Sequence, residues 1–223
     1  QIMSYQADEV AEQKERKRAF DDVSDELNAQ KNEQEEALAA QEAKRAEAQS
    51  VVKDATARLE GAQEEHAARL AELAAQAEAL RKQLEALVQA DAEAFLPLAA
   101  AYGLPKETPE QQAHKAAVLE QALDGACAVP LETMEACCEG IALAQEYAAK
   151  GSALAVSDAG CAALFCKAAL QASGLNVSIN TKLMADRAHA EALNTKADAL
   201  LAQYVPLADT LYEKMATQLR GEV

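Results

Sequence analysis

The chain has 223 residues and a formal net charge of −16, from 37 acidic and 21 basic residues. This balance argues against nucleic acid or an anionic membrane surface as a partner, because both bind to a basic face. Tryptophan is absent and aromatic residues make up 4% of the chain. Any core must therefore be built mainly from Ala, Leu and Val, which implies closely packed helices.

The cysteines indicate the compartment. They are Cys127, Cys137, Cys138, Cys161 and Cys166. Their number is odd, and their spacing is neither that of a zinc site nor that of a secreted disulfide framework. We therefore expect buried free thiols in a cytoplasmic protein. The three histidines lie far apart without a Cys or Asp at ligand spacing, so we predict no metal site.

No segment is typical of a signal peptide. The apolar run after Gly151 carries Asp158 and Lys167. Charged residues inside the run predict a buried core helix and not a membrane span. Because the first residue is Gln rather than Met, we expect residue 1 to be the start of a fragment.

Residues 1–66 contain 17 acidic and 9 basic residues and no proline. Apolar residues recur there in steps of three and four, and the pattern continues into the next segment. The positions are Phe20, Val23, Leu27, Leu38, Val52, Ala55, Leu59, Leu70, Leu73, Ala77, Leu80, Leu84 and Leu87. This spacing is an a/d stripe. We predict a separate domain at residues 1–66, a long charged helix in a coiled coil or helical hairpin, with another helix as its partner.

All five prolines lie in residues 67–223, where prolines, glycines and capping residues separate the expected helices. The first helix is expected to end or kink near Pro97 and to stop around residues 103–105. Thr108 is expected to cap the next helix, because Pro109 suits the first helical position and a Gln lies three residues after the cap.

Further along, residues 124–130 predict a kink or a short break, and the helix that follows is expected to end at Gly151. Ser157 or Asp158 is expected to cap an apolar helix that runs to about Gly174. A last helix is expected at about residues 185–219. No segment alternates like a strand, so we predict an all-α bundle of five or six helices.

Four segments, in order, give the chain a family resemblance. They are residues 91–95 (DAEAF), 102–108 (YGLPKET), 151–160 (GSALAVSDAG) and 175–182 (LNVSINTK). From about residue 67 to about residue 219 the chain resembles the cyclodeaminase/cyclohydrolase family, which comprises formimidoyltetrahydrofolate cyclodeaminase and bacterial methenyltetrahydrofolate cyclohydrolase. The third segment resembles the stand-alone cyclohydrolases more. The family's N-terminal Pro-Gly-Gly-Gly-Ser loop, part of its folate site, has no counterpart in residues 1–66.

The resemblance implies acid–base chemistry on a one-carbon unit bridging two folate nitrogens, without a metal or other cofactor. Asp91 matches the acidic residue of the family's first segment, which makes it the candidate for proton transfer. It precedes Phe95 by one helical turn, so both are expected to face one cleft. The alternative is an ordinary exposed helix residue.

The resemblance also supplies candidate substrate-binding residues. Asp158, with Ser157 beside it, matches the third segment, although capping alone would explain either residue. Asn176 and Asn180 are four apart on one helical face, where amides can read a pterin ring; satisfied buried amides or a turn are equally compatible. Lys182 would meet the glutamate tail of a folate, or is a solvated surface charge.

Two functional hypotheses follow. The first is a homodimeric folate enzyme, in which an apolar crevice closes around Asp91 and Asp158. The second is a non-catalytic coiled-coil assembly or engineered fusion, in which residues 1–66 mediate helix pairing and the remainder is a folded anchor.

Overall fold

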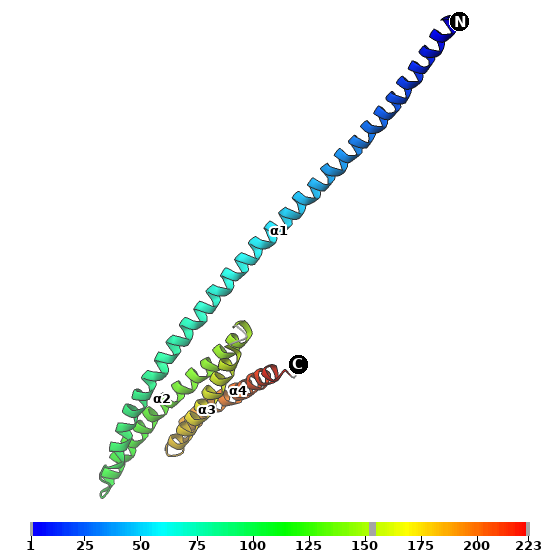
Figure 1. Ribbon diagram of the computed structural model, residues 1–223. Coiled ribbons are helices and arrows are strands. Elements are labelled where there is room, and N and C mark those ends of the chain that lie inside the picture. Colours follow the sequence, from blue (N-terminus) through cyan, green and yellow to red (C-terminus); the bar gives the residue numbers. More distant parts are fainter. Residues whose placement is uncertain (1, 152–154, 222–223) are drawn as a thin grey trace. The chain divides into compact units, whose positions relative to one another are not determined.

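The computed structural model describes the backbone of residues 2–151 and 155–221, and side chains from residue 9 onward. These residues form four α-helices and no strand. The helices are α1 (Ile2–Tyr102), α2 (Pro109–Lys150), α3 (Val156–Thr181) and α4 (Arg187–Arg220) (Figure 1). The all-α prediction is confirmed, but the expected count of five or six helices is wrong for the described chain.

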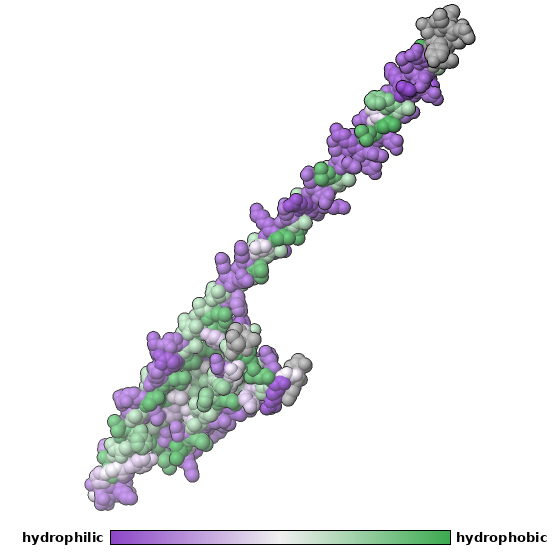
Figure 2. Space-filling view, in the orientation of Figure 1, coloured by the Kyte–Doolittle hydropathy of each residue, from purple (hydrophilic) through white to green (hydrophobic). Residues whose placement is uncertain are grey.

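The chain divides into two compact units, Gln1–Glu64 and Glu65–Val223. All the described residues of the first unit belong to α1. Its apolar stripe is exposed from Phe20, at 73% of the side chain's full accessibility, to Leu59, at 59%. Figure 2 shows apolar and polar surface alternating along this unit. The assignment of residues 1–66 and 67–223 as separate domains stays a prediction.

In the second unit, residues 65–102 of α1 pack on α2. Leu73, Leu80 and Leu87 are buried at seven-residue intervals and form a cluster with Ala136 and Leu143. A seven-residue interval returns a side chain to nearly the same face of a helix, so the stripe read from the sequence is the packed face here.

The main core lies between α2, α3 and α4, and α3 packs on both of the others (Figure 1). Its fully buried members are Met134, Ile141, Ala163, Leu170, Val177 and Ala208. A third cluster joins Leu98 at the end of α1 to Leu123 of α2. Small residues contribute many of these contacts, as the composition predicted.

The start of α2 confirms the predicted cap. The Thr108 hydroxyl accepts a hydrogen bond from the backbone N–H of Gln111 at 3.2 Å, and the Gln111 side chain accepts one from the backbone N–H of Thr108 at 3.2 Å. Pro109 follows the cap, where its missing N–H costs nothing. This capping box satisfies donors that would otherwise lack partners.

Of the two alternatives expected near residues 124–130, a short break does not occur, and a kink stays a prediction. Helix α2 continues through Gly125 and Pro130 to Lys150. A proline inside a helix costs roughly 3 kcal/mol. Pro130 is buried, and its neighbour Leu131 belongs to the main core. Tertiary packing of α2 thus outweighs the local preference for a break.

The predicted ends of α3 are also wrong. Its N-cap is Ala155, with no side-chain hydrogen bond, so neither Ser157 nor Asp158 caps the helix. The helix continues past Gly174 to Thr181. A Cβ atom on Gly174 would lie 3.3 Å from Leu201 Cδ1. This glycine therefore permits close contact with α4 and does not end the helix.

The last helix begins close to its predicted position. Its N-cap is Asp186, whose carboxylate accepts from the backbone N–H of His189 at 2.9 Å. The carboxylate of Glu120, on α2, accepts from the backbone N–H groups of Ala185 and Asp186 at 2.7 and 2.9 Å. The turn before α4 is thus fastened to α2.

A histidine adds a second link between α2 and α4. His189 Nε2 lies 2.7 Å from Asp124 Oδ1. The hydrogen bond to Asp124 raises the pKa of His189, and the nearby charges of Asp186 and Glu120 act in the same direction. Because the folded-state pKa lies above the unfolded value, the stabilisation is complete below the unfolded pKa. It is lost as the pH rises through the folded pKa.

We expect Asp124→Asn to lower the melting temperature more at about pH 5.5 than at about pH 8.5, because His⁺ is present only at the lower pH. Thermal denaturation at both pH values measures the difference. Asp198→Asn, an exposed substitution on α4, is the control and should behave alike at both. Equal losses for Asp124→Asn at the two pH values would contradict the ion pair.

Candidate functional site

A pocket of about 300 Å³ lies between α1, α2 and α3. Asp91 and Phe95 line it from α1, and Asn176 and Asn180 line it from α3. The predicted one-turn relation of Asp91 to Phe95 therefore does bring both side chains to one cleft. The four-residue spacing of the two asparagines likewise places both on it. We refer to this hollow as the Asp91 pocket.

The two asparagines differ in their surroundings. Asn180 is half-buried, and its side-chain nitrogen donates to the carbonyl oxygen of Ala126 at 3.0 Å. That bond holds the amide in place and leaves its oxygen as an acceptor. Asn176 is exposed. Ala92 and Ala94 of α1 also line the pocket. The sequence analysis missed three further apolar lining residues, Ala126, Pro130 and Ile179; no local signal marks them, because α2 and α3 meet here only in the folded chain.

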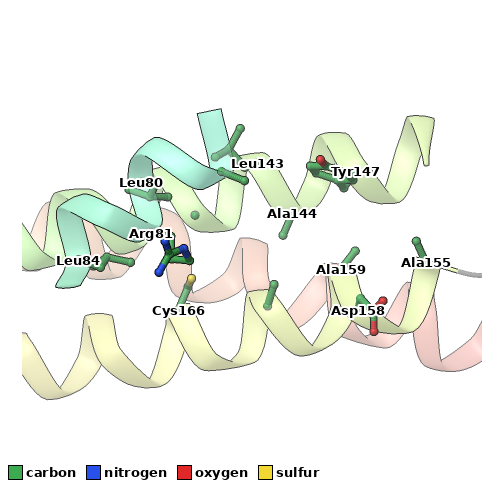
Figure 3. Close-up of a pocket in the computed structure, with 13 residues that line it drawn as sticks. Leu80, Arg81, Leu84, Leu143, Ala144, Tyr147, Ala155, Asp158, Ala159 and Cys166 are labelled. Atoms are coloured by element: carbon green, nitrogen blue, oxygen red, sulfur yellow. The ribbon is translucent and has the colours of Figure 1, made fainter. Parts of the chain in front are cut away.

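A second, larger pocket of about 510 Å³ lies further along the same three helices. Figure 3 shows Leu80 and Leu84 of α1, Leu143 and Tyr147 of α2, and Ala159 of α3 around it. The lining is almost entirely apolar. We refer to it as the Leu80 pocket.

Two charged side chains reach the Leu80 pocket. Arg81 lies beside Cys166, whereas Asp158 lies towards Ala155 at the other end (Figure 3). Arg81 is held by Glu78 and Glu85 of its own helix. These carboxylates raise the pKa of Arg81, Glu78 through the stronger hydrogen bond.

The two candidate acids do not share a crevice in the described chain. Asp91 lines the Asp91 pocket and Asp158 lines the Leu80 pocket. Both carboxylates are exposed in the single chain, so no crevice within one chain closes around the two acids. The physical reason is the distance between the two pockets along α1. Arg81 lines the Leu80 pocket and Asp91 lines the Asp91 pocket, and they are ten residues apart, which corresponds to about 15 Å of helix.

The remaining candidates lie outside both pockets. Ser157 and Lys182 are exposed and line neither of them. Arg187, a neighbouring cation, donates to the carbonyl oxygens of Thr181 at 2.7 Å and Met184 at 3.1 Å. Arg187 therefore supplies hydrogen-bond donors to the carbonyl groups at the C-terminal end of α3.

The cysteines are free thiols. Burial raises the pKa of Cys127 to about 11 and that of Cys137 to about 12. Such thiols stay protonated and are poor nucleophiles. Cys161 is exposed, which corrects the expectation that all five are buried. Among the described side chains, those of residues 9–151 and 155–221, no three from His, Cys, Asp or Glu are placed to hold a metal ion.

The same described ranges contain no helix with both the length and the apolar composition that a bilayer crossing requires.

Comparison with known proteins identifies the family. The family described as Formiminotransferase-cyclodeaminase matches residues 48–199, most of the chain. This chain belongs to the formiminotransferase-cyclodeaminase family. The match confirms the resemblance read from the four segments, and it begins earlier than residue 67. Asp91, Asn176 and Asn180, which meet at the Asp91 pocket, all lie within the matched residues.

Individual relatives agree with this family. The chain is 40% identical over 142 residues to the methenyltetrahydrofolate cyclohydrolase of Methylorubrum extorquens, covering 64% of this chain and 68% of that protein. It is 36% identical over 121 residues to the formimidoyltransferase-cyclodeaminase of Mus musculus, covering 54% of this chain but only 22% of that protein.

Among solved structures, the chain is similar to formiminotetrahydrofolate cyclodeaminase from Thermotoga maritima. The identity is 26%, the TM-score is 0.49, and the similarity covers 65% of this chain and 66% of that one.

Proposed function

We propose that this family member is an enzyme of folate one-carbon metabolism, and that it hydrolyses the methenyl bridge of methenyltetrahydrofolate. The observation that carries the proposal is the 40% identity to a protein named methenyltetrahydrofolate cyclohydrolase, over 68% of that protein's length. The Asp91 pocket supports it, because one carboxylate and two amides converge there beside an aromatic ring.

In the proposed reaction, water adds to the amidinium carbon while Asp91 accepts a proton. The same carboxyl group then returns that proton to the departing ring nitrogen. The carbon–nitrogen bond breaks, and the hydroxyl group on the carbon releases its proton to solvent, which leaves a formyl group on the other nitrogen. One residue thus serves as base and then as acid. No metal or other cofactor takes part in the proposed steps.

The remaining lining would position the substrate. The amides of Asn176 and Asn180 would bond the donors and acceptors of a pterin ring, and Phe95 would pack against its face. A hollow of about 300 Å³ is at the small end for ligand pockets. It would therefore hold the reacting end of a folate, with the glutamate tail outside. Ser157, Asp158 and Lys182 stay predictions as further substrate contacts.

The second candidate is formimidoyltetrahydrofolate cyclodeaminase activity, in which an internal nitrogen attacks and ammonia leaves. The 36% identity to the mouse formimidoyltransferase-cyclodeaminase favours it. Both reactions require proton transfer at the same carbon, so both would use Asp91. The non-catalytic assembly has no comparable support from the relatives.

The proposal includes a cytoplasmic homodimer, with a further helix as partner of residues 1–66. The net charge of −16 supports partners other than nucleic acid or anionic membranes.

The test is a pair of assays on the purified chain. We expect loss of the methenyl chromophore with methenyltetrahydrofolate, at a rate that a chelator leaves unchanged. With formimidoyltetrahydrofolate as substrate, we also expect this chain to release less ammonia than an equal amount of a known cyclodeaminase does. Turnover of neither substrate, together with no shift of the melting temperature by tetrahydrofolate at high concentration, would refute the proposal, since a ligand that binds the folded state must stabilise it.

A further inference from the structure

Helix α3 exposes one face that the bundle does not cover. Eight residues follow one another along it in alternating steps of three and four, and we call them the α3 seam. They are Asp158, Cys161, Phe165, Ala168, Ala172, Leu175, Ile179 and Lys182. All eight are exposed, including Phe165 at 77% and Leu175 at 71% of full accessibility. Such spacing is the a/d pattern by which helices pair.

The residues beside the seam carry no charge. They are Ala162, Leu164, Ala169, Gln171, Asn176 and Ser178, and all are exposed. The nearest cation on the helix, Lys167, is engaged with Asp209 of α4. In a chain that is 26% charged, an exposed strip that carries no charge between Asp158 and Lys182 and is mainly apolar indicates a contact surface, because monomers rarely expose one.

We propose that the α3 seam pairs with the α3 seam of a second copy of this chain, antiparallel, about a two-fold axis at residue 170. In that register two residues face each other when their residue numbers add up to 340. Phe165 faces the partner's Leu175, Ala168 faces the partner's Ala172, and Cys161 faces the partner's Ile179. Every layer then joins an a position to a d position, as antiparallel pairing requires.

Size complementarity supports this register. The alanine layers lie at the centre, where they let the two backbones approach closely, and the bulky layers lie on either side. The contact is isologous, with one patch facing its own copy, which closes a dimer and leaves no seam open. An uncharged strip is also where two copies of a chain with net charge −16 can meet with the least repulsion.

The charges at the ends of the seam decide the direction. The residue numbers of Asp158 and Lys182 add up to 340, so antiparallel pairing places the carboxylate of Asp158 opposite the ammonium group of the partner's Lys182. Parallel pairing would instead place Asp158 against the partner's Asp158 and Lys182 against the partner's Lys182. Like charges in register oppose association. Ile179 also lines the Asp91 pocket, so the pairing would bring the partner's α3 to the mouth of that pocket.

Phe165→Glu tests the seam itself. We expect the wild type to sediment as a dimer and the variant to dissociate, with the dissociation constant raised at least ~100-fold, because the substitution buries two unpaired carboxylates. Phe165 is exposed, so the fold should survive, as circular dichroism will report. Ala199→Glu, an exposed change on α4, is the matched control and should stay dimeric. A monomeric wild type, or a Phe165→Glu variant as dimeric as the control, would overturn the proposal.

Charge reversal and cross-linking test the register. Asp158→Lys and Lys182→Asp should each weaken the dimer, and the double variant should restore it, a rescue that contact with a small molecule would not produce. With Ile179→Cys, a mild oxidant should join position 179 to the partner's Cys161. Wild-type chains should not cross-link, since their Cys161 residues would lie about 27 Å apart. Absence of the first cross-link, or a wild-type Cys161–Cys161 cross-link, rejects this register whatever the oligomeric state.

Discussion

Asp91→Asn is expected to lower kcat/KM for methenyltetrahydrofolate at least ~100-fold, because a positioned general base contributes about 10²- to 10⁴-fold. The amide keeps the shape of the side chain but cannot take up the proton of the attacking water. The loss should fall mainly on kcat, since Asn176, Asn180 and Phe95 would still hold the substrate. Steady-state kinetics, followed by loss of the methenyl chromophore, measure both parameters.

Glu93→Gln is the control for Asp91→Asn. Glu93 lies two residues further along α1, is exposed, does not line the Asp91 pocket, and accepts a hydrogen bond from Gln89 at 2.8 Å. The same loss of one carboxylate there should leave kcat/KM within about twofold, as expected of a surface change. Because Asp91 is exposed too, neither variant should unfold. A fully active Asp91→Asn enzyme would remove this residue from the mechanism.

Leu170→Ala is expected to reduce the free energy of unfolding by about 3 kcal/mol. Leu170 lies in the middle of α3, has no accessible surface, and belongs to the cluster that joins α3 to α2 and α4. Truncation removes its contacts and leaves a cavity that rigid neighbouring helices cannot fully close. Urea unfolding measures the change. Near-ultraviolet circular dichroism is a suitable probe, because four of the five tyrosines lie in the unit Glu65–Val223.

The matched control is Leu96→Ala, the same truncation at an α1 side chain that is 65% exposed. Little surface is removed from solvent there on folding, so the expected change is within about 0.5 kcal/mol. Comparable losses for the two variants would mean that Leu170 does not occupy the core of the folded protein.

Local patterns in the sequence were sufficient for the class of fold. The capping box at Thr108, the α4 start near Asp186 and the buried repeat of Leu73, Leu80 and Leu87 each depend on residues no more than seven positions from the next. Interactions of that range are set by helix geometry alone. The family resemblance is confirmed as well. It is carried by short segments, and each segment can be recognised without knowing which residues lie near it in space.

Predictions failed where the role of a residue is set by its contacts with another helix. Gly174 looked like a stop signal but serves a close contact with Leu201 of α4. Pro130 looked like a break but lies within a helix that three clusters hold in place. Propensity costs at single positions are a few kcal/mol at most, and burial of a long helix outweighs them.

The sequence by itself determined that the chain is helical, which faces are apolar, and which family it joins. Only the tertiary structure decided that Asp91 meets Asn176 and Asn180, that Asp158 belongs to a different pocket, and that one apolar face of α3 stays uncovered. The reason is physical. Periodicity specifies the angle of a side chain about its own helix, whereas the neighbour it meets depends on how far each helix is shifted along the next, and that shift is set by packing between residues distant in sequence.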